Sequence, residues 1–429
     1  MLFAVYQKKF FIVFFLIVTC LLIIIGSVRR DLFQYHSYND SAFLLPQNTL
    51  YPLSQNDKEI VDTLIHTKIL KDESLFKIIS NPELSVHASA IMEKDSTLMA
   101  LFYAGTKEGA ADVKIYQSFL YKDSKEWSKS KPILTRQDLE YLTGKYFRKL
   151  GNPIVFKDNQ GKVHCFVVGV SLGGWATSKI YQFYFDSMWA LHYVGELHLS
   201  PFGNLSHLVR TPAIPLQNGG FIVPIAHEMW IKYPLIVFFD KNGVMRFKKR
   251  INKLTQQLQP TIMPIANRDC VAFFRSQNIS DVPPGFYQEC HENANVWDTP
   301  ILSNLSNHDS SSVLISFDNY GKQEILLAHN NKTRKNLTLY WLQDHKQGVF
   351  KELFKIDEQN GEVSYPAMAI DNENLYITWT FYRKNIKYTS IKLSILGTLI
   401  ENAKNEILDN EQNLNMKSQV LSSQEAGYL

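Results

Sequence analysis

The sequence contains little cysteine, and its cysteines follow no metal-binding spacing. Four cysteines stand at positions 20, 165, 270 and 290 of 429, without a Cys-x-x-Cys pair. This pattern implies neither a metal site nor a dense disulfide framework, and no cofactor is expected. Cys165 and Cys270 lie in apolar runs typical of strands, so we expect both to be buried thiols.

The chain also lacks a strong excess of charge of either sign. Its 45 Lys and Arg residues nearly balance 41 Asp and Glu residues, which leaves a formal net charge of +4. Nucleic-acid binding requires a concentrated basic patch, so no nucleic-acid partner is expected. Aromatic residues make up 13% of the chain, a share that suits the half-buried faces of stacked β-sheets.

Long apolar runs are scarce, and the one that occurs extends from Phe10 to Val28. Its 19 residues carry no charge, and this length can cross about 30 Å of hydrocarbon as a helix. We therefore expect an N-terminal transmembrane anchor, with a cleaved signal peptide as the alternative. Gly26-Ser27 is only a weak cleavage signal. With no second span, the body lies on one side of the membrane, and we expect it outside the cytoplasm, periplasmic or at the cell surface.

A hairpin-like stretch occurs six times along the rest of the chain. In its clearest copy, Ser364 to Arg383, an apolar lead-in meets a polar turn and a β-branched and aromatic run follows. The copies recur every ~50–65 residues, a spacing that fits the four-stranded blades of a propeller. The six turn centres fall near Asp95, Gln160, Asn218, Asn267, Asn319 and Asn372.

These patterns divide the chain into four parts. We expect a membrane anchor over residues 1–30 and a linker with a short helical segment over residues 31–84. Residues 57–79 show partial helical periodicity, so this linker is expected to hold one or two short helices or a strand packed on the body. A six-bladed all-β propeller over residues 85–395 and a polar tail over residues 396–429 complete the expected organisation.

Two kinds of turn carry a resemblance to a known family. The turns that end at Trp127, Trp189, Gly243 and Gly348 look like worn Asp boxes, the Ser-x-Asp-x-Gly-x-x-Trp turns of sialidases. The inner hairpins, which include LGNPIVF, GGWATSKI, LQPTIMP and VSYPAMA, are more specific. From about residue 85 to 392 the chain resembles the bacterial sialidase-like BNR-repeat family of predicted exo-α-sialidases (neuraminidases). This resemblance implies a six-bladed propeller, in agreement with the six hairpins.

A propeller directs the ends of its inner strands at one central funnel, so residues at equivalent positions of the repeat converge. The hairpin starts are His87, Asn152, Arg210, Gln259, Asp309 and Tyr365. The hairpin ends are Lys107, Trp175, His227, Glu228, Arg275, Asn330, Arg334 and Arg383. Such a polar ring favours a binding or catalytic site, although strand ends also meet water and some of these residues could simply be solvated or form ion pairs between blades.

The resemblance implies roles for some of these residues. Sialidases hold the substrate carboxylate with three arginines, use a tyrosine nucleophile polarised by a glutamate, and use an aspartate as acid/base. Arg275, Arg334 and Tyr365 stand in the sialidase order, and Asp112 follows His87 as the acid/base aspartate follows the first arginine. The candidate catalytic residues are Asp112, Tyr365, His87 and Glu228. The candidate substrate-binding residues are Arg275, Arg334, Arg383, Gln259, His227, Trp175, Lys107 and Asn330.

Two positions depart from the family pattern. His87 stands where the first arginine is expected, and Gln259 stands where the glutamate that activates the tyrosine is expected. Glutamine cannot accept a proton as a carboxylate does, so Glu228 or His227 would have to assist Tyr365. His87 could act as an acid or base near neutral pH.

Three hypotheses remain open on the sequence. The leading one is a membrane-anchored sialidase-like glycoside hydrolase whose partner is an acidic glycan, sialic or uronic. The alternative is a non-catalytic glycan-binding propeller that has lost the sialidase base at Gln259. The third is a propeller that acts as a scaffold for envelope proteins.

Overall fold

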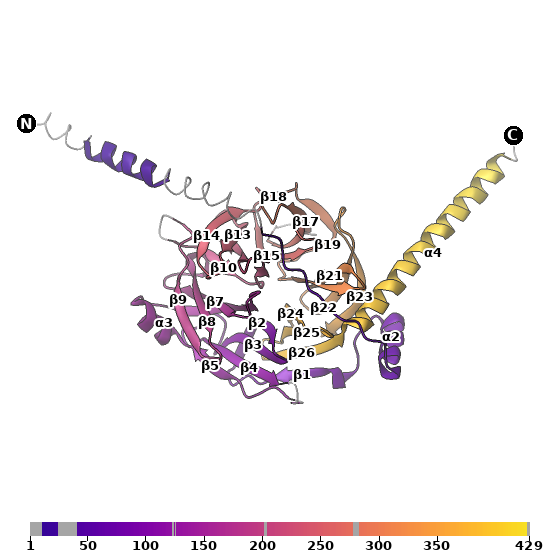
Figure 1. Cartoon of the computed structure of the whole chain (residues 1–429), viewed down its shortest axis with the longest axis horizontal. Helices are drawn as coiled ribbons and strands as arrows, with labels where there is room; N and C mark the ends of the chain where they lie inside the picture. Colours follow the sequence, from indigo (N-terminus) through magenta and orange to yellow (C-terminus); the bar gives the residue numbers. More distant parts are fainter. Residues whose placement is uncertain are drawn as a thin grey trace, which may run out of the picture.

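The computed structural model describes residues 11–24 and 41–426, except residues 122, 123, 125, 201–203 and 278–282. Within these residues, six antiparallel sheets surround a central axis, and each sheet is one blade of a propeller (Figure 1). The six-bladed all-β fold expected from the sequence is confirmed.

Each blade has four main strands, which follow one another in the sheet from the axis to the outer edge. Blade 1 holds β2 Ser85–Lys94, β3 Thr97–Gly105, β4 Lys114–Tyr121 and β5 Lys131–Leu134; blade 2 holds β6 Lys149–Lys157, β7 Val163–Val170, β8 Ser178–Phe185 and β9 Leu191–Glu196. Blade 3 holds β10 His207–Val209, β11 Ile214–Pro215, β12 Phe221–His227, β13 Tyr233–Phe239 and β14 Met245–Arg250; blade 4 holds β15 Gln257–Pro264, β16 Cys270–Ser276, β17 Pro284–His291, β18 Val296–Trp297 and β19 Ile301–Ser306. Blade 5 holds β20 Val313–Asn319, β21 Lys322–His329, β22 Asn336–Asp344 and β23 Val349–Glu358; blade 6 holds β24 Val363–Ile370, β25 Asn374–Phe381, β26 Asn385–Lys392 and β1 Phe76–Ile79.

All six predicted hairpins form the inner part of a blade. In each sheet the predicted turn joins the innermost strand to its neighbour, for example β6 to β7 and β24 to β25. Aspartates stabilise these turns: Asp158 Oδ1 accepts from the backbone amides of Gln160 and Lys162, each at 2.9 Å. Asp371 Oδ1 accepts from the amide of Glu373 at 2.8 Å in the same way. Side-chain oxygens that bond the backbone two residues on are the physical basis of such turns.

Four inner strands carry a β-bulge at the same place. The strand register shifts in β2, β6, β15 and β24, and one residue of each bulge has a positive φ. These residues are Ala88, Asn152, Gln259 and Tyr365, with φ of 53°, 37°, 42° and 55°. A bulge bends a strand and redirects a side chain, and bulges are common next to functional sites. In blade 1 the equivalent of Tyr365 is therefore Ala88, one residue beyond the hairpin start assigned to His87.

Strands from both ends of the chain close the propeller. β1 pairs with β26, with Phe76 opposite Thr389, so the last blade takes its outermost strand from the N-terminal segment. This closure brings blade 6 against blade 1, where the amide of Val86 donates to the carbonyl of Arg383 at 2.9 Å. The segment before β1 also holds the helix α2 (Gln55–Thr67) and the 3-10 turn η1 (Glu73–Leu75).

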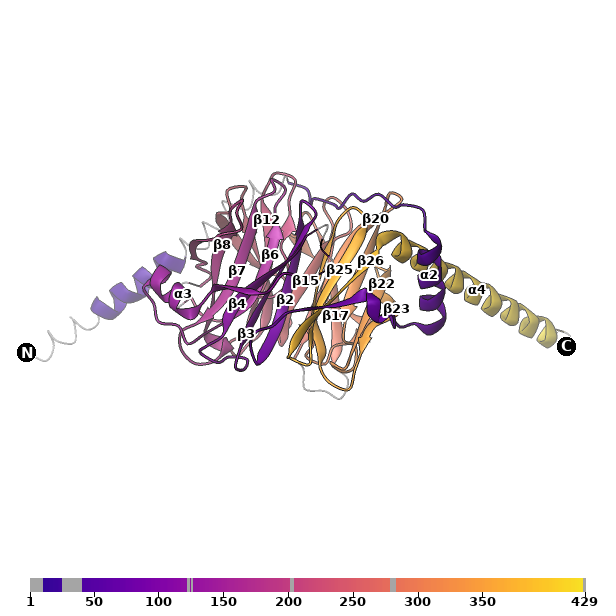
Figure 2. The same ribbon diagram turned by 90° about the horizontal axis from the view of Figure 1, so that it is seen from below.

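Two helices cover the outer edge of blades 5 and 6. α2 begins at a capping box formed by Ser54 and Asp57, and it buries Val61 and Leu64 on one face. α4 (Leu393–Ala426) follows β26 directly, packs its first turns beside α2, and then extends away from the propeller (Figures 1 and 2). Beneath them lies the fully buried Trp379, whose Nε1 donates to Asp357 at 2.9 Å. A third helix, α3 (Arg136–Thr143), precedes blade 2.

The expected membrane span lies only partly within the described residues. Residues 11–24 are helical, whereas residue 10 and residues 25–28 of the expected span are outside the described ranges. Among the helices described, none combines the length and the apolar character that crossing a bilayer requires.

One expectation about the cysteines is wrong. Cys270 is not a thiol but forms a disulfide with Cys290, at a Cα–Cα distance of 4.9 Å. The two residues are direct cross-strand neighbours on β16 and β17, and both are completely buried. Cys165 is a buried free thiol, as expected.

Candidate functional site

The structure gathers three arginines and one histidine around Tyr365. Tyr365 lies at the bulge of β24 and is 7% exposed. Arg275, at the end of β16 in blade 4, donates from Nη1 to the Tyr365 hydroxyl at 2.8 Å. The guanidinium carbons of Arg334 and Arg210 lie 5.4 and 5.2 Å from the centroid of the Tyr365 ring. Residues from blades 3, 4, 5 and 6 therefore meet here although they are distant in sequence.

Carboxylates pair with the two arginines from blades 4 and 5. Asp309 Oδ1 accepts from Arg275 Nε at 2.7 Å, and its other carboxylate oxygen lies 4.0 Å from Arg334 Nη2. Arg334 Nη1 also donates to Glu362 at 3.3 Å. Burial lowers the pKa of Arg275, but the nearby oxygen of Tyr365 and the bonds to Asp309 outweigh it and raise that pKa above its usual value. Both guanidiniums are thus held in place by charge-assisted hydrogen bonds to carboxylates.

Arg383 is held at the junction between blades 6 and 1. Its Nε donates to Glu362 at 2.5 Å, and its Nη1 bonds to Glu108 in the β3–β4 loop. Its carbonyl accepts from Val86, the residue before His87. Although the expected arginine is absent at position 87, propeller closure places a guanidinium from the β25–β26 turn beside that position.

Glu362 joins Arg334 to Arg383. It accepts from both guanidiniums and from the Ser364 hydroxyl, the latter at 2.6 Å. Burial raises the pKa of Glu362, but the bonds to Arg383 and Ser364 and the charges of the two arginines outweigh it, so the net shift is downward. Glu362 is therefore a fixed anion that orients two cations.

His87 lies directly against Tyr365. The two ring centroids are 4.1 Å apart, His87 is 1% exposed, and neither ring nitrogen has a hydrogen-bond partner among the described residues. Burial, followed by the charges of four arginines led by Arg383 and Arg334, lowers the pKa of His87 well below its usual value. His87 is a neutral imidazole at neutral pH, which does not favour the acid/base role considered from the sequence.

Glu228 differs from Glu362 in that its pKa is raised above the usual value of a glutamate. It follows β12, and its backbone amide donates to the Ser206 carbonyl at 2.9 Å. Burial raises the pKa of Glu228, an effect that the positive charges of Arg275 and Lys232 only partly offset. Since Arg275 also bonds to Tyr365, Glu228 belongs to the same electrostatic neighbourhood.

Gln259 occupies the β15 bulge that corresponds to the bulge of Tyr365. It is 6% exposed, and its Oε1 has no hydrogen-bond partner among the described residues. A neutral amide here cannot take a proton from a hydroxyl group. Any proton acceptor for Tyr365 must be a side chain other than Gln259.

The β3–β4 loop carries Asp112 and Lys107, and both are exposed. Asp112 accepts from the backbone amide of Thr106 at 2.9 Å and from its hydroxyl at 3.0 Å, so it also stabilises its own loop. The same loop supplies Glu108, the partner of Arg383. Asp112 is thus attached to the loop that reaches the arginines, but no bond joins it to Tyr365.

Trp175 lies on blade 2 beside the bulge of β6. Its ring covers Gly151, where an added Cβ would come within 2.5 Å of the indole. Lys149 Nζ sits 3.9 Å from the ring centroid, a cation–π contact. Trp175 is half-buried, so it packs against the blade and still presents part of its ring.

Two further candidates lie apart from the Tyr365 contacts. Asn330 is completely buried, and its amide donates to the carbonyls of Asn336 and Val363, so it supports the backbone of blades 5 and 6. His227 stacks on Tyr233 at 4.7 Å and faces the carbonyl of Ile231. Burial lowers the pKa of His227, which disfavours its charged form.

Sequence reasoning gave no role to several residues that build this centre. Arg210 and Asp309 were recognised only as hairpin starts. Arg210 donates to the carbonyls of Ser89 and Pro366 at 3.1 and 2.9 Å, so it links blade 3 to blades 1 and 6. Burial lowers the pKa of Arg210 to about 10. Glu362 was missed, and the only available signal was its place next to the hairpin start at Ser364.

Comparison with known proteins places this architecture. The family model for the BNR repeat-like domain matches residues 96–377. No curated protein matches the chain in sequence. Among solved structures, the Hadza microbial sialidase Hz136 is similar, with a TM-score of 0.61 and 12% identity over 72% of this chain and 66% of its own.

Two other solved structures are similar to the same degree. Trypanosoma rangeli sialidase, in complex with the inhibitor DANA, has a TM-score of 0.58 and 13% identity over 76% of this chain and 58% of its own. A Dyadobacter fermentans protein of unknown function has a TM-score of 0.59 and 12% identity over 74% of this chain and 97% of its own. The chain thus spans less than two thirds of the length of the two sialidases, and at these identities the likeness establishes the shared fold alone.

Proposed function

The chain belongs to the family of proteins with a BNR repeat-like domain, and from this premise we propose that it is a sialidase-like glycoside hydrolase that acts on an acidic glycan. One observation carries the proposal. Arg275 donates to the Tyr365 hydroxyl, and a second guanidinium, that of Arg334, lies over the same ring. A cluster of guanidiniums beside an oriented hydroxyl nucleophile suits a sugar that carries a carboxylate.

In this proposal Arg275, Arg334 and Arg383 bind the sugar carboxylate. Each guanidinium has five donors and uses only some of them on Asp309, Glu362 or Glu108, so donors remain for a ligand. The carboxylates fix the guanidiniums before the ligand arrives, which reduces the entropy lost on binding.

Tyr365 is the proposed nucleophile, and Glu228 is the proposed acceptor of its proton. Gln259 cannot take this proton, whereas the raised pKa of Glu228 makes it a stronger base than an ordinary carboxylate. Asp112 is the proposed acid/base on the leaving-group side, because its loop also carries the Glu108 that reaches Arg383. Tyr365 attacks the anomeric carbon while the glycosidic bond breaks, and Asp112 protonates the leaving oxygen. Water then hydrolyses the glycosyl–enzyme.

A second candidate function is glycan binding without turnover. The neutral amide at Gln259 favours it, because the expected base is missing at that bulge. The three arginines Arg275, Arg334 and Arg383 would then bind the glycan without any bond being broken.

Membrane attachment outside the cytoplasm is also part of the proposal. The uncharged run from residue 10 to 28 supports an anchor, and the Cys270–Cys290 disulfide supports an oxidising compartment. Carbonate extraction tests the anchoring. Release of the protein with a mature N-terminus near residue 27 would show a cleaved signal peptide instead.

A panel of fluorogenic glycosides tests the activity. We expect hydrolysis of an α-sialoside or a β-uronide and none of a neutral hexoside. Binding of acidic glycans on an array without turnover of any substrate supports the second function. Preferred hydrolysis of the neutral hexoside contradicts both.

A further inference from the structure

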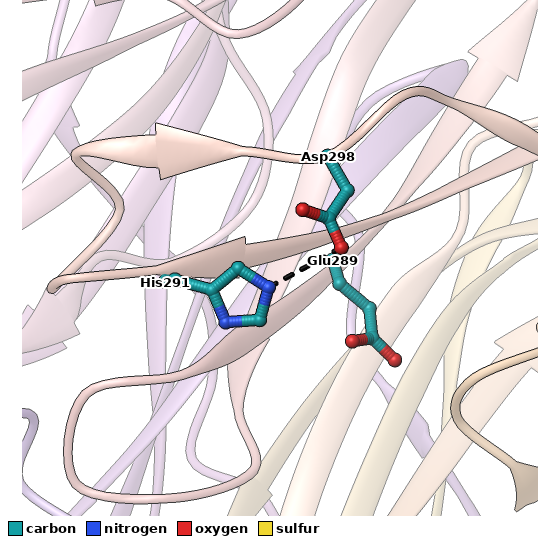
Figure 3. A group of neighbouring side chains, drawn as sticks. All are labelled: Glu289, His291 and Asp298. Atoms are coloured by element: carbon teal, nitrogen blue, oxygen red, sulfur yellow. Dashed lines mark hydrogen bonds and ion pairs between the residues drawn. The ribbon is translucent and has the colours of Figure 1, made fainter.

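A cluster of metal-ligand side chains lies on blade 4, away from the Tyr365 centre. Glu289 and His291 alternate with Cys290 on β17, so both point to the same side of the sheet. Asp298 follows β18, and its backbone amide donates to the Glu289 carbonyl at 3.1 Å. Ligand atoms of the three side chains all lie within 4.8 Å of one another, with the His291 ring facing the Asp298 carboxylate (Figure 3).

A further candidate donor, outside this group of three, comes from the neighbouring blade. His345, in the β22–β23 turn of blade 5, places Nδ1 2.9 Å from Glu289 Oε1. The set thus contains two imidazoles and two carboxylates from three separate segments. Imidazole and carboxylate donors together suit zinc and similar divalent transition metals, whereas calcium and magnesium prefer oxygen ligands alone.

One pair of donor atoms already has the separation that a zinc ion requires, and the third donor has to move closer. Ligand atoms about 2.0–2.1 Å from a tetrahedral zinc ion lie roughly 3.3 Å apart. His291 Nε2 and Asp298 Oδ2 are 3.2 Å apart, close to that separation. The third donor, from Glu289, lies within 4.8 Å of the other two, so it has to approach by up to about 1.5 Å to reach that separation.

The second ring nitrogen of His291, Nδ1, has the kind of partner that metal-ligating histidines have. Its Nδ1 faces Asp269 Oδ1 at 2.9 Å, which leaves Nε2 directed at Asp298. Metal-ligating histidines almost always bond a carboxylate or carbonyl through the other ring nitrogen, which fixes the ring. Asp269 belongs to the β15–β16 turn, at the opposite end of β16 from Arg275. The cluster is therefore on the face opposite the Tyr365 centre.

The buried carboxylate of Glu289 is paired with an exposed cation that a metal ion could replace. The Glu289 side chain is 6% exposed, and its second oxygen accepts from Lys346 at 2.9 Å. Lys346 is 68% exposed, so it is free to turn into solvent when another cation arrives. Without a metal, the same groups form an ion-pair network between blades 4 and 5, which is the competing explanation.

We propose that Glu289, His291, Asp298 and His345 bind one divalent transition-metal cation of the zinc class, which clips blade 4 to blade 5. The ion is structural, because the site lies at the end of the blades opposite the arginine cluster. It adds a link beside the Cys270–Cys290 disulfide in the same strand pair. The proposal is independent of the proposed hydrolase activity.

Titration of the full-length, tag-free chain with zinc after chelator treatment tests the site. We expect one equivalent bound, by calorimetry and by metal analysis, and an increase in melting temperature on adding zinc. His291→Ala and the peripheral His345→Ala should each weaken binding at least about tenfold and abolish the zinc-dependent increase. The matched control is His192→Ala, because His192 pairs with Asp186 at 2.8 Å in an exposed turn of blade 2. No third donor of this kind joins that pair among the described residues.

The measurement can overturn the proposal in two ways. One is zinc binding that stays the same in both His291→Ala and His345→Ala, as it does in His192→Ala. The other is no stoichiometric binding at all, with His291→Ala lowering the melting temperature equally with and without zinc. Either result identifies the cluster as an ion-pair network only. His345→Ala keeps the test open if His291→Ala fails to fold, because His345 is half exposed.

Discussion

Arg275 Nη1 donates to the hydroxyl of Tyr365 at 2.8 Å, although the two residues are 90 positions apart in the chain. The bond joins blade 4 to blade 6 across the axis of the propeller. It fixes the hydroxyl next to the guanidinium that the proposal assigns to the substrate carboxylate. The bond exists only because six hairpins close into a ring, and so the repeat, the fold and the proposed chemistry depend on one another.

The first prediction concerns the proposed nucleophile. Tyr365→Phe should lower the turnover of an acidic glycoside by a hundredfold or more, because covalent catalysis is lost, while binding of the same glycan changes little. The matched control is Tyr320→Phe. Tyr320 is an exposed tyrosine on a hairpin turn, and its backbone has a positive φ as Tyr365 does. Steady-state kinetics together with equilibrium binding check it. Unchanged turnover in Tyr365→Phe removes the tyrosine from the mechanism.

The second prediction concerns recognition of the acidic group. Arg334→Ala should weaken binding of an anionic glycan by roughly ten- to a hundredfold, since a charge-assisted hydrogen bond contributes about 1.5–3 kcal/mol. The fold should survive, because Arg334 lies in a loop and is half-buried.

Lys332→Ala serves as the control for Arg334→Ala. It removes a positive charge from an exposed side chain of the same loop. Equal losses of affinity in the two variants would mean that the loop attracts anions generally and that Arg334 makes no specific contact.

The third prediction concerns pH. A base must be deprotonated to act, and burial raises the pKa of Glu228 above its usual value. Activity should therefore fall as the pH drops through this raised pKa, at a higher pH than an ordinary glutamate would give. Glu228→Gln should lose most of the turnover and also this acidic limb of the kcat/KM profile. A variant that keeps both the turnover and the limb excludes Glu228 as the proton acceptor.

The fourth prediction concerns the disulfide. Under denaturing, non-reducing conditions the chain should show two free thiols, Cys20 and Cys165, and four after reduction. The Cys270→Ala/Cys290→Ala variant should lose about 3 kcal/mol of unfolding free energy. The chain-entropy model gives this value for a loop closed by cysteines 20 positions apart. Cys165→Ala provides the control for loss of a buried sulfur without a crosslink. Four free thiols before reduction would contradict the assignment.

Much of the fold followed from the sequence because a hairpin is a local feature. Turn chemistry and alternating strands lie within about 20 residues of each other, so the six turns from Asp95 to Asn372 could be found directly. The bulges could not be placed so well. The bulges shift the register of an inner strand, but no single residue type marks them. The sequence therefore aligned His87 with Tyr365, whereas the structural equivalent of Tyr365 is Ala88.

Contacts between strands that are distant in sequence, and between blades, were harder to predict. The pairing of Cys270 with Cys290 depends on the register of β16 against β17. The link between Arg383 and Glu108 crosses the closure of the ring and joins residues 275 positions apart. The approach of His345 to Glu289 likewise depends on how blade 5 packs on blade 4. No local pattern encodes these contacts, since the first depends on strand register within a blade and the other two depend on how blades pack against one another.

A structure of the chain with bound sialic acid or a uronic acid tests the central proposal most directly. We expect the sugar carboxylate to lie about 3 Å from the guanidiniums of Arg275 and Arg334, as charge-assisted bonds require. The anomeric carbon should face the Tyr365 hydroxyl. A sugar bound elsewhere, or bound here with its carboxylate directed away from both arginines, would contradict the account.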